Sequence, residues 1–295
     1  MTILQIVVLA AIQGAAELLP VSSSAHVIVA ERLMGLDPSS PELTFLLVML
    51  HTGTMFAVLV YFWKRWAALL RAKSGFLKAV VVATAVTGVV GLTLKVIIEK
   101  IILVKVMGHS KGEIESLFRY LPLIAGSLFV VGCYIIYAGL KSSRETLVVS
   151  GSTSITQKNA VIVGLVQAIC LPFRGLSRSG STISAALIQK ISRPVAEDFS
   201  FALAVVLTPP VIFLELHRLL NATAKSSEGT VAMTPHDLVA LLQPGLLGMV
   251  FSFASGLLAL KWLSRWLENG KWAFFGYSCI LASLFVMGVQ LSSGA

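Results

Sequence analysis

The chain has 295 residues, of which 56% are hydrophobic and only 13% charged, and its formal net charge is +9. Because soluble domains carry about a quarter charged residues, this composition excludes an ordinary soluble protein and predicts an all-α polytopic membrane protein. The basic residues stand in short clusters between apolar stretches, as membrane topology produces, so we expect no nucleic-acid partner. The cysteines lie in apolar segments without the spacing of a metal or disulfide framework.

Six apolar segments reach the roughly 20 residues that a helix needs to cross a bilayer. They cover residues 43–63, 79–98, 120–140, 199–216, 238–260 and 272–291. Lys and Arg concentrate in the connections 64–78, 141–158 and 261–271. Placing these connections in the cytoplasm satisfies the positive-inside rule and predicts six transmembrane helices with both chain ends outside.

Two further regions, 1–42 and 159–197, are apolar but are interrupted by glycine, proline and serine. For six spans to hold, each region must enter and leave the membrane on the same side, the first from outside and the second from inside. Irregular backbone at membrane depth is tolerated only where protein or a water-filled cavity satisfies its polar groups. We therefore predict two re-entrant helical hairpins that together form a site.

The two interrupted regions resemble each other. "IQGAAELLPVSSSAHVIVAERL" and "LVQAICLPFRGLSRSGSTISAAL" place a glutamine, a proline and a serine cluster in the same order. Three spans follow each hairpin, and since three is odd, the second copy is inverted relative to the first. We expect a first repeat at 1–140, a cytoplasmic connection at 141–158 and a second, inverted repeat at 159–295. Inverted repeats with broken helices place their site near the bilayer midplane.

The first hairpin carries a polar cluster in "QGAAELLPVSSSAH". Gln13 and Glu17 are four residues apart and share a helix face. Pro20 ends that helix, because the residue before a proline avoids the α region. The three serines that follow are expected to cap the next helix, and His26 adds a group that titrates near neutral pH. A carboxylate at membrane depth needs a partner or a function, and Glu17 suits a hard divalent cation such as Mg²⁺, with Gln13 as a weaker ligand.

The second hairpin carries "RGLSRSGSTIS" at the start of an apolar helix. Free N–H groups and the positive end of a helix dipole bind anions, and arginine adds a planar fork of donors that suits phosphate. The segment lacks the lysine of a nucleotide-binding loop and follows no strand, so a nucleotide site is excluded. The expected phosphate-binding residues are Ser22, Arg174, Gly175, Ser177, Ser179, Gly180 and Thr182.

Both segments together resemble the undecaprenyl-diphosphate phosphatase family, the bacitracin-resistance type of bacterial membrane phosphatase. The family's first motif is (E/Q)-x-x-x-E followed by P-V-S-S-x-x-H, and its second is P-G-x-S-R-S-G-x-T. The matching residues are Gln13, Glu17, Pro20, Val21, Ser22, Ser23 and His26, then Gly175, Ser177, Arg178, Ser179, Gly180 and Thr182. The chain departs from the second motif at Arg174, where the family usually has proline, which leaves open a further phosphate contact or a side chain that reaches the interface.

The resemblance implies a multi-pass enzyme of the bacterial inner membrane that recycles the lipid carrier of cell-wall synthesis. Its substrate would be a long-chain prenyl diphosphate, its cofactor a divalent cation, Mg²⁺ or Ca²⁺, and its site would open to the periplasmic side. The implied catalytic residues are Glu17, Ser23, His26 and Arg178, with Glu17 and Gln13 on the cation. Oligomeric state is left open, a homodimer included.

Several alternatives stand beside this interpretation. Either Ser23 attacks phosphorus with His26 as its base, or His26 takes the phosphoryl group directly. A lipid transporter or flippase is the rival function, because inverted repeats and broken helices are typical of transporters. A phosphatidic-acid type phosphatase is excluded, since its motif requires histidine where this chain has Ser184. His51 and Gln167 are each left between a cavity-lining role and a structural one.

Overall fold

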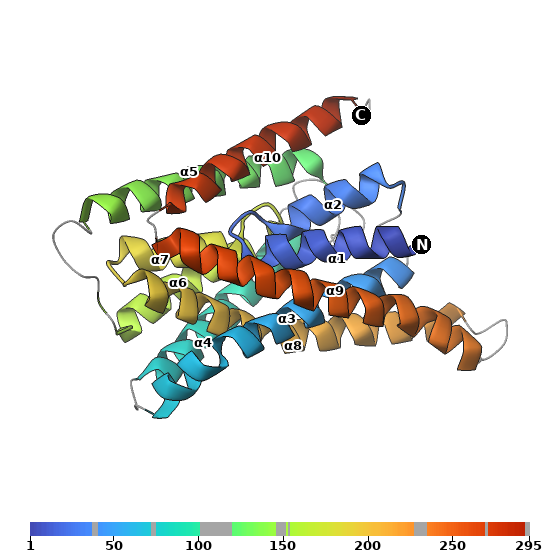
Figure 1. The fold of residues 1–295 in the computed structure, drawn as a ribbon, viewed down its shortest axis with the longest axis horizontal. Helices are drawn as coiled ribbons and strands as arrows, with labels where there is room; N and C mark the ends of the chain where they lie inside the picture. The colour runs from blue at the N-terminus through green and yellow to red at the C-terminus, as the bar shows by residue number, and fades with distance from the viewer. Residues whose placement is uncertain are drawn as a thin grey trace.

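A computed structural model describes residues 1–36, 41–71, 75–100, 120–145, 152, 154–226, 235–268 and 271–292. Within these ranges the chain is almost entirely helical (Figure 1), and its one β contact is an isolated bridge between Ser152 and Ile191. The helices are α1 (Ile3–Leu18), α2 (Ser23–Leu33), α3 (Pro41–Arg71), α4 (Phe76–Ile97), α5 (Leu121–Glu145), α6 (Gln157–Cys170), α7 (Arg178–Ile188), α8 (Arg193–Ser226), α9 (Pro235–Glu268) and α10 (Trp272–Ser292). This confirms the all-α prediction.

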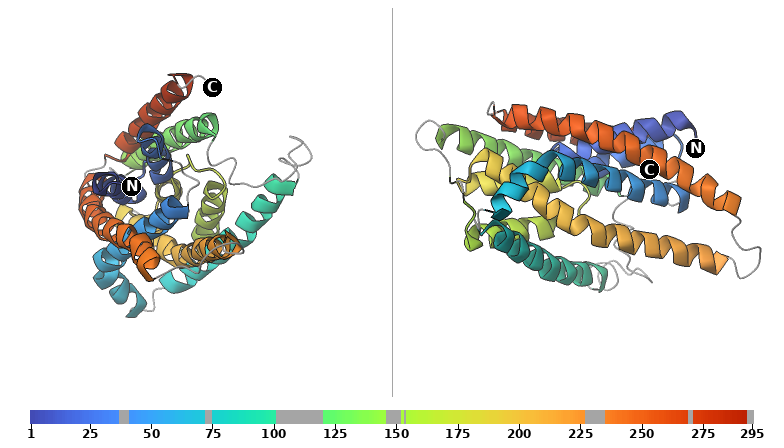
Figure 2. Two further views of the ribbon diagram at one scale, coloured as in Figure 1. Left: turned by 90° about the vertical axis from the view of Figure 1, so that its right-hand side faces the viewer. Right: turned by 60° about the horizontal axis from the view of Figure 1, so that its bottom comes forward.

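Six of the described helices are long and apolar enough to cross a membrane, namely α3, α4, α5, α8, α9 and α10. They correspond one to one with the six predicted spans. Large apolar side chains such as Leu92, Leu258 and Leu281 lie exposed on their outer faces, where lipid would cover them. The long helices run in broadly similar directions, and Figure 2 shows the bundle from two further sides.

Helix ends differ from the expected boundaries. Helix α5 continues to Glu145 and α6 begins at Gln157, so helical residues occupy both ends of the expected 141–158 connection. Helix α8 likewise continues to Ser226, beyond the expected span 199–216, and α9 begins at Pro235, before the expected span 238–260. Polar residues at these positions extend the helices beyond the apolar stretches that defined the spans.

The two interrupted regions form pairs of short helices. In the first pair α1 ends at Leu18, and Leu19 adopts the extended conformation that a following Pro20 requires. Ser22 has a positive φ of 66° and α2 begins directly after it. In the second pair residues 171–177 connect α6 to α7. The predicted break at Pro20 is confirmed, and α6 ends two residues before Pro172, while entry and exit on the same side of a membrane stays a prediction.

Helices from the first half of the chain pack against helices from the second half. Helix α1 packs on α9, and α6 packs on α4. Helix α3 packs on both α9 and α8, and α5 packs on α10, beside which it lies in Figure 1. Ser255 of α9 donates a hydrogen bond to the carbonyl of Ala10 (3.2 Å), and Thr87 of α4 donates to that of Gly164 (3.0 Å). Ala10 and Gly164 each stand three residues before the glutamine of their hairpin. The inverted repeat stays a prediction, and these matched contacts support it.

Candidate active site

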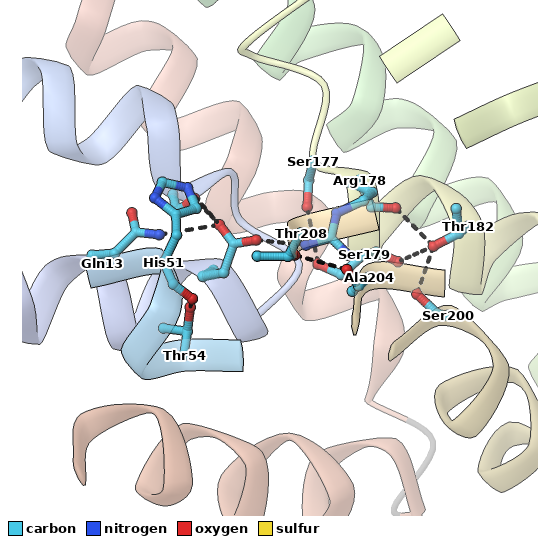
Figure 3. Close-up of polar contacts among 12 residues, drawn as sticks. Gln13, His51, Thr54, Ser177, Arg178, Ser179, Thr182, Ser200, Ala204 and Thr208 are labelled. Atoms are coloured by element: carbon cyan, nitrogen blue, oxygen red, sulfur yellow. Dashed lines mark hydrogen bonds and ion pairs between the residues drawn. The ribbon is translucent and has the colours of Figure 1, made fainter. Parts of the chain in front are cut away.

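The carboxylate of Glu17 is the centre of a polar cluster built from four helices. Its Oε1 accepts a hydrogen bond from Arg178 Nη2 of α7 at 2.5 Å. Its Oε2 accepts from Ser23 Oγ of α2 at 2.6 Å and from Gln13 Nε2 of α1 at 3.3 Å. The Nε2 of His51, on α3, lies 3.8 Å from the same Oε2. In Figure 3 Gln13 and His51 lie on one side of the site and Arg178 lies on the other.

Local backbone structure explains how the two hairpins meet at this point. Glu17 stands in the last turn of α1, one turn after Gln13, so both side chains share a face. Arg178 is the first residue of α7, and Ser177 caps that helix by accepting a hydrogen bond from Gly180 N at 3.2 Å. The residues were predicted from two motifs far apart in the sequence, and the structure brings them within hydrogen-bond distance.

The Arg178 guanidinium has a hydrogen-bond donor that no described residue accepts. Its Nη1 is buried and has no hydrogen-bond partner among the described residues, while Nη2 pairs with Glu17. A cation at a helix N-terminus adds to the positive end of the dipole, which is unfavourable unless an anion lies opposite. The Glu17 carboxylate is that anion in this structure. The start of α7 is therefore arranged to receive negative charge and can bind more of it than Glu17 supplies.

The serines of the first hairpin do not cap α2, and that prediction is wrong. The Ser22 side chain makes no capping hydrogen bond; it donates instead to the carbonyl of Arg174 at 2.6 Å, and Ser24 donates to the same oxygen at 2.8 Å. From the other side, Ser179 Oγ lies 3.5 Å from the carbonyl of Leu19. Partly buried loop carbonyls between two broken helices need donors, and hydroxyls from the opposite hairpin supply them.

The expected phosphate-binding residues therefore fall into two groups. The hydroxyls of Ser22, Ser177 and Ser179 line the junction of the hairpins near Arg178. Thr182 lies one turn further along α7, is fully buried, and shares a 2.6 Å hydrogen bond with Ser200 of α8 (Figure 3). Arg174 contributes its main-chain carbonyl to the junction. The structure thus gives Thr182 a packing contact with α8 and leaves its predicted phosphate contact untested.

His26 lies on the first turn of α2, and its ring is oriented by its own helix. Nδ1 is 2.8 Å from the carbonyl of Ser22, and since a carbonyl only accepts, Nδ1 carries the proton of that hydrogen bond. Nε2 is then free to accept. Among the described residues His26 makes no hydrogen bond to Ser23, whose hydroxyl is directed to Glu17. In this structure the Ser23 hydroxyl donates to Glu17, in contrast to the pairing with His26 considered from sequence.

Three further residues acquire definite positions. His51 faces Glu17 from α3, a placement that sequence spacing left undecided because α3 is remote from both motifs. Gln167 donates to Thr87 Oγ1 of α4 at 3.0 Å and has a structural contact. Ser184, the position that the rejected phosphatase motif reserves for histidine, accepts a hydrogen bond from the indole of Trp272 at 2.9 Å. No sequence signal indicated Ser200 and Trp272, which both make hydrogen bonds to α7.

Gly175 holds the loop before α7 against α5. A Cβ at this position would lie 2.3 Å from the carbonyl oxygen of Ile124 and 2.4 Å from Cβ of Ser127. We expect Gly175→Ala to move this loop, with an overpacking cost of about 1–3 kcal/mol, and to lower activity by displacing Arg178. Thermal unfolding in detergent and phosphate release measure both effects. Gly126→Ala on α5, where a Cβ meets nothing within 4 Å, is the matched control. Equal behaviour of the two variants would contradict this assignment.

Fold and site together define a class: a multi-pass membrane protein with an acid, an arginine and hydroxyls converging between two broken helix pairs. Residues 6–285 match the family model described as "Bacitracin resistance protein BacA", so the chain belongs to the BacA family.

Named relatives cover the chain almost from end to end. It is 53% identical over 291 residues to the undecaprenyl-diphosphatase 2 of Acinetobacter baylyi, covering 97% of this chain and 98% of that protein. It is 31% identical over 292 residues to the undecaprenyl-diphosphatase of Rhodopirellula baltica, covering 98% of each. It is 32% identical over 312 residues to that of Gluconacetobacter diazotrophicus, again covering 98% of each. The resemblance drawn from two motifs is confirmed over the whole length.

Proposed function

We propose that this protein hydrolyses undecaprenyl diphosphate to undecaprenyl phosphate and inorganic phosphate, and so recycles the lipid carrier of cell-wall synthesis. Family membership and the relatives' names support this assignment. The observation that carries it in this chain is Arg178, with a buried donor left over beside a carboxylate and a serine hydroxyl. Phosphoryl transfer needs a positioned nucleophile and a positively charged group that neutralises the negative phosphoryl oxygens, and these residues provide both.

Arg178 binds the diphosphate through its fork of donors, together with the first N–H groups of α7. Ser22, Ser177 and Ser179 surround this position, while the N–H of Gly180 is already taken by Ser177. As Arg178 turns from Glu17 to the terminal phosphate, the carboxylate loses one partner and becomes a better base. The ion pair seen here thus holds both groups in place until substrate arrives.

Ser23 is the proposed nucleophile, because its proton is directed to Glu17 Oε2 at 2.6 Å. Ser23 Oγ forms a bond to the terminal phosphorus, its proton passes to Glu17, and the P–O bond to undecaprenyl phosphate breaks. His26, with Nε2 free to accept, then takes a proton from water. The water oxygen bonds to phosphorus, the bond to Ser23 breaks as Glu17 returns its proton to Ser23 Oγ, and inorganic phosphate leaves while His26 releases its proton to water.

The donors at Glu17 fit a cation that is shared with the substrate. The described residues hold no group of three His, Cys, Asp or Glu side chains that could bind a metal alone. Mg²⁺ typically takes one or two carboxylates and completes its coordination with phosphates and water. Glu17 Oε2 and the Gln13 amide, one helical turn apart, would hold it. When bound, the cation neutralises phosphate charge; Ca²⁺ could serve in the same place.

Location and assembly are part of the proposal. The multi-pass architecture fits an inner-membrane enzyme, and the placement of basic connections in the cytoplasm supports a site open to the periplasmic side. The substrate is a long-chain prenyl diphosphate lipid, and no nucleic acid takes part. A homodimer is compatible with the extensive exposed apolar surface of the helices.

Phosphate release by the purified protein in detergent, with long-chain prenyl diphosphate, tests this function. We expect release that EDTA abolishes and that Mg²⁺ or Ca²⁺ restores, because EDTA competes for a cation that the described residues hold through only a few ligands. Phosphate release that is unchanged by EDTA would contradict the proposal that a divalent cation is required. No release from folded protein, together with movement of lipid across vesicle membranes, would favour the rival function of a flippase.

A further inference from the structure

His51 approaches the Glu17 carboxylate from α3, opposite the approach of Arg178 (Figure 3). Its ring is fixed by its own helix, because Nδ1 lies 2.8 Å from the carbonyl of Leu47. The carbonyl accepts, so Nδ1 donates, and Nε2 is the nitrogen that faces Glu17 Oε2 at 3.8 Å. Histidines that bind metals have this same arrangement, with the second ring N–H donated to a carbonyl or carboxylate that orients the ring.

The space beside Oε2 is bounded by groups that can all donate a lone pair. When the His51 ring is neutral, its Nε2 and Glu17 Oε2 are both acceptors 3.8 Å apart, and a positive ion between them interacts favourably with both. The amide of Gln13 stands on the same side, and its oxygen faces this position if the amide turns by half a rotation. The imidazole is 42% exposed whereas the Glu17 side chain is 16% exposed, so a cation can enter past His51.

We propose that His51 Nε2 is a direct ligand of the divalent cation, together with Glu17 Oε2 and the oxygen of Gln13. The inference rests on the proposed function, which requires a cation at Glu17. Two ligand atoms of one ion lie about 3–3.5 Å apart at usual bond lengths, so a shift of a few tenths of an ångström closes the site. Arg178 does not compete with the cation, since its Nη2 pairs with the other carboxylate oxygen, Oε1, and its Nη1 has no partner among the described residues and is left for phosphate.

A nitrogen ligand changes which cation the site prefers. Mg²⁺ and Ca²⁺ take oxygen ligands, whereas imidazole favours transition metals, and affinity for such sites rises from Mn²⁺ onward in the first-row series. The site therefore binds Mn²⁺ more tightly than Mg²⁺, and His51 is the residue responsible for the difference. A carboxylate and an amide without His51 would give a much smaller preference.

The test measures metal binding without substrate or turnover. Purified protein in detergent is titrated with Mn²⁺, free Mn²⁺ is followed by its electron paramagnetic resonance signal, and Mg²⁺ is then added as competitor. We expect one site, and in His51→Gln about a tenfold or greater loss of Mn²⁺ affinity with a much smaller change for Mg²⁺. Glu17→Gln should remove binding. His217→Gln, on an exposed part of α8, is the matched control and should bind as wild type does.

Two results would overturn the proposal. One is Mn²⁺ affinity in His51→Gln equal to wild type while Glu17→Gln has lost it, which leaves the cation at Glu17 without His51. The other is no Mn²⁺ binding by wild-type protein. Phosphate release with Mg²⁺, measured on the same preparations, separates either result from a failure of the phosphatase assignment. Thermal unfolding of each variant, His51→Ala included, distinguishes a loss of Mn²⁺ affinity from a loss of folded protein.

Discussion

Glu17→Gln should lower the rate of phosphate release by about 10²- to 10⁴-fold, the range that a positioned acid–base group contributes. The amide has the same shape as the carboxylate but cannot take the proton of Ser23, which lies 2.6 Å away. It also removes the negative charge opposite Arg178 at the start of α7. Steady-state phosphate release by purified protein, with kcat and KM determined separately, measures the effect. Arg178 remains to bind diphosphate, so we expect the loss in kcat to exceed the rise in KM that follows from the loss of the cation at Glu17.

Two comparisons make this prediction specific. Arg178→Lys keeps the charge but loses the planar fork, so it should raise KM as well as lower kcat. Arg265→Ala, on an exposed position of α9, should change neither value. A Glu17→Gln protein with wild-type kcat would contradict the role of Glu17 as the base, and would leave the carboxylate as a structural partner of Arg178.

The fold was predictable because its signals are local and physically strong. Six apolar stretches of membrane length determine six helices, and they occur in the structure at the expected places. Pro20 determines the end of α1, because it forces Leu19 out of the helical region. The pairing of Gln13 with Glu17 also followed from helical spacing alone. Each of these features depends on residues within a few positions of one another.

What the sequence did not reveal depends on contacts between distant helices. His51 lies 34 positions from Glu17, and only the packing of α3 beside α1 brings its ring to the carboxylate. The hydroxyl of Ser22 has a partner 152 positions away, the carbonyl of Arg174, so it was assigned to the cap of its own helix. A serine after a helix break fits several roles equally well. The opposing hairpin decides among them.

The structure also explains why the two motifs are separated in the sequence. Each hairpin leaves unsatisfied backbone groups where its helices break, and the hydroxyls of one hairpin bind the carbonyls of the other. The same junction brings an acid from the first hairpin to an arginine from the second. A site built in this way exists only when both hairpins are packed together, so folding of the halves and formation of the site are coupled.

His26→Ala should lower phosphate release by about 10²- to 10⁴-fold and should accumulate a phosphorylated enzyme. In the proposed mechanism Ser23 and Glu17 carry out the first step without His26, whose Nε2 is needed only when water attacks. Substrate labelled at its terminal phosphate would therefore leave label on His26→Ala protein, with one undecaprenyl phosphate released per enzyme and little inorganic phosphate. Ser23→Ala should show neither label nor turnover.

The chemical stability of the label identifies the residue that carries it. Phosphoserine survives acid, whereas phosphohistidine is hydrolysed by acid and survives alkali. Label that is stable in acid, present in His26→Ala and absent from Ser23→Ala would support attack by Ser23. Label that is lost in acid and absent from His26→Ala would instead make His26 the nucleophile. In that case the hydrogen bond from Ser23 to Glu17 would only hold the carboxylate in position, and the free Nε2 of His26 would be the reactive atom of the site.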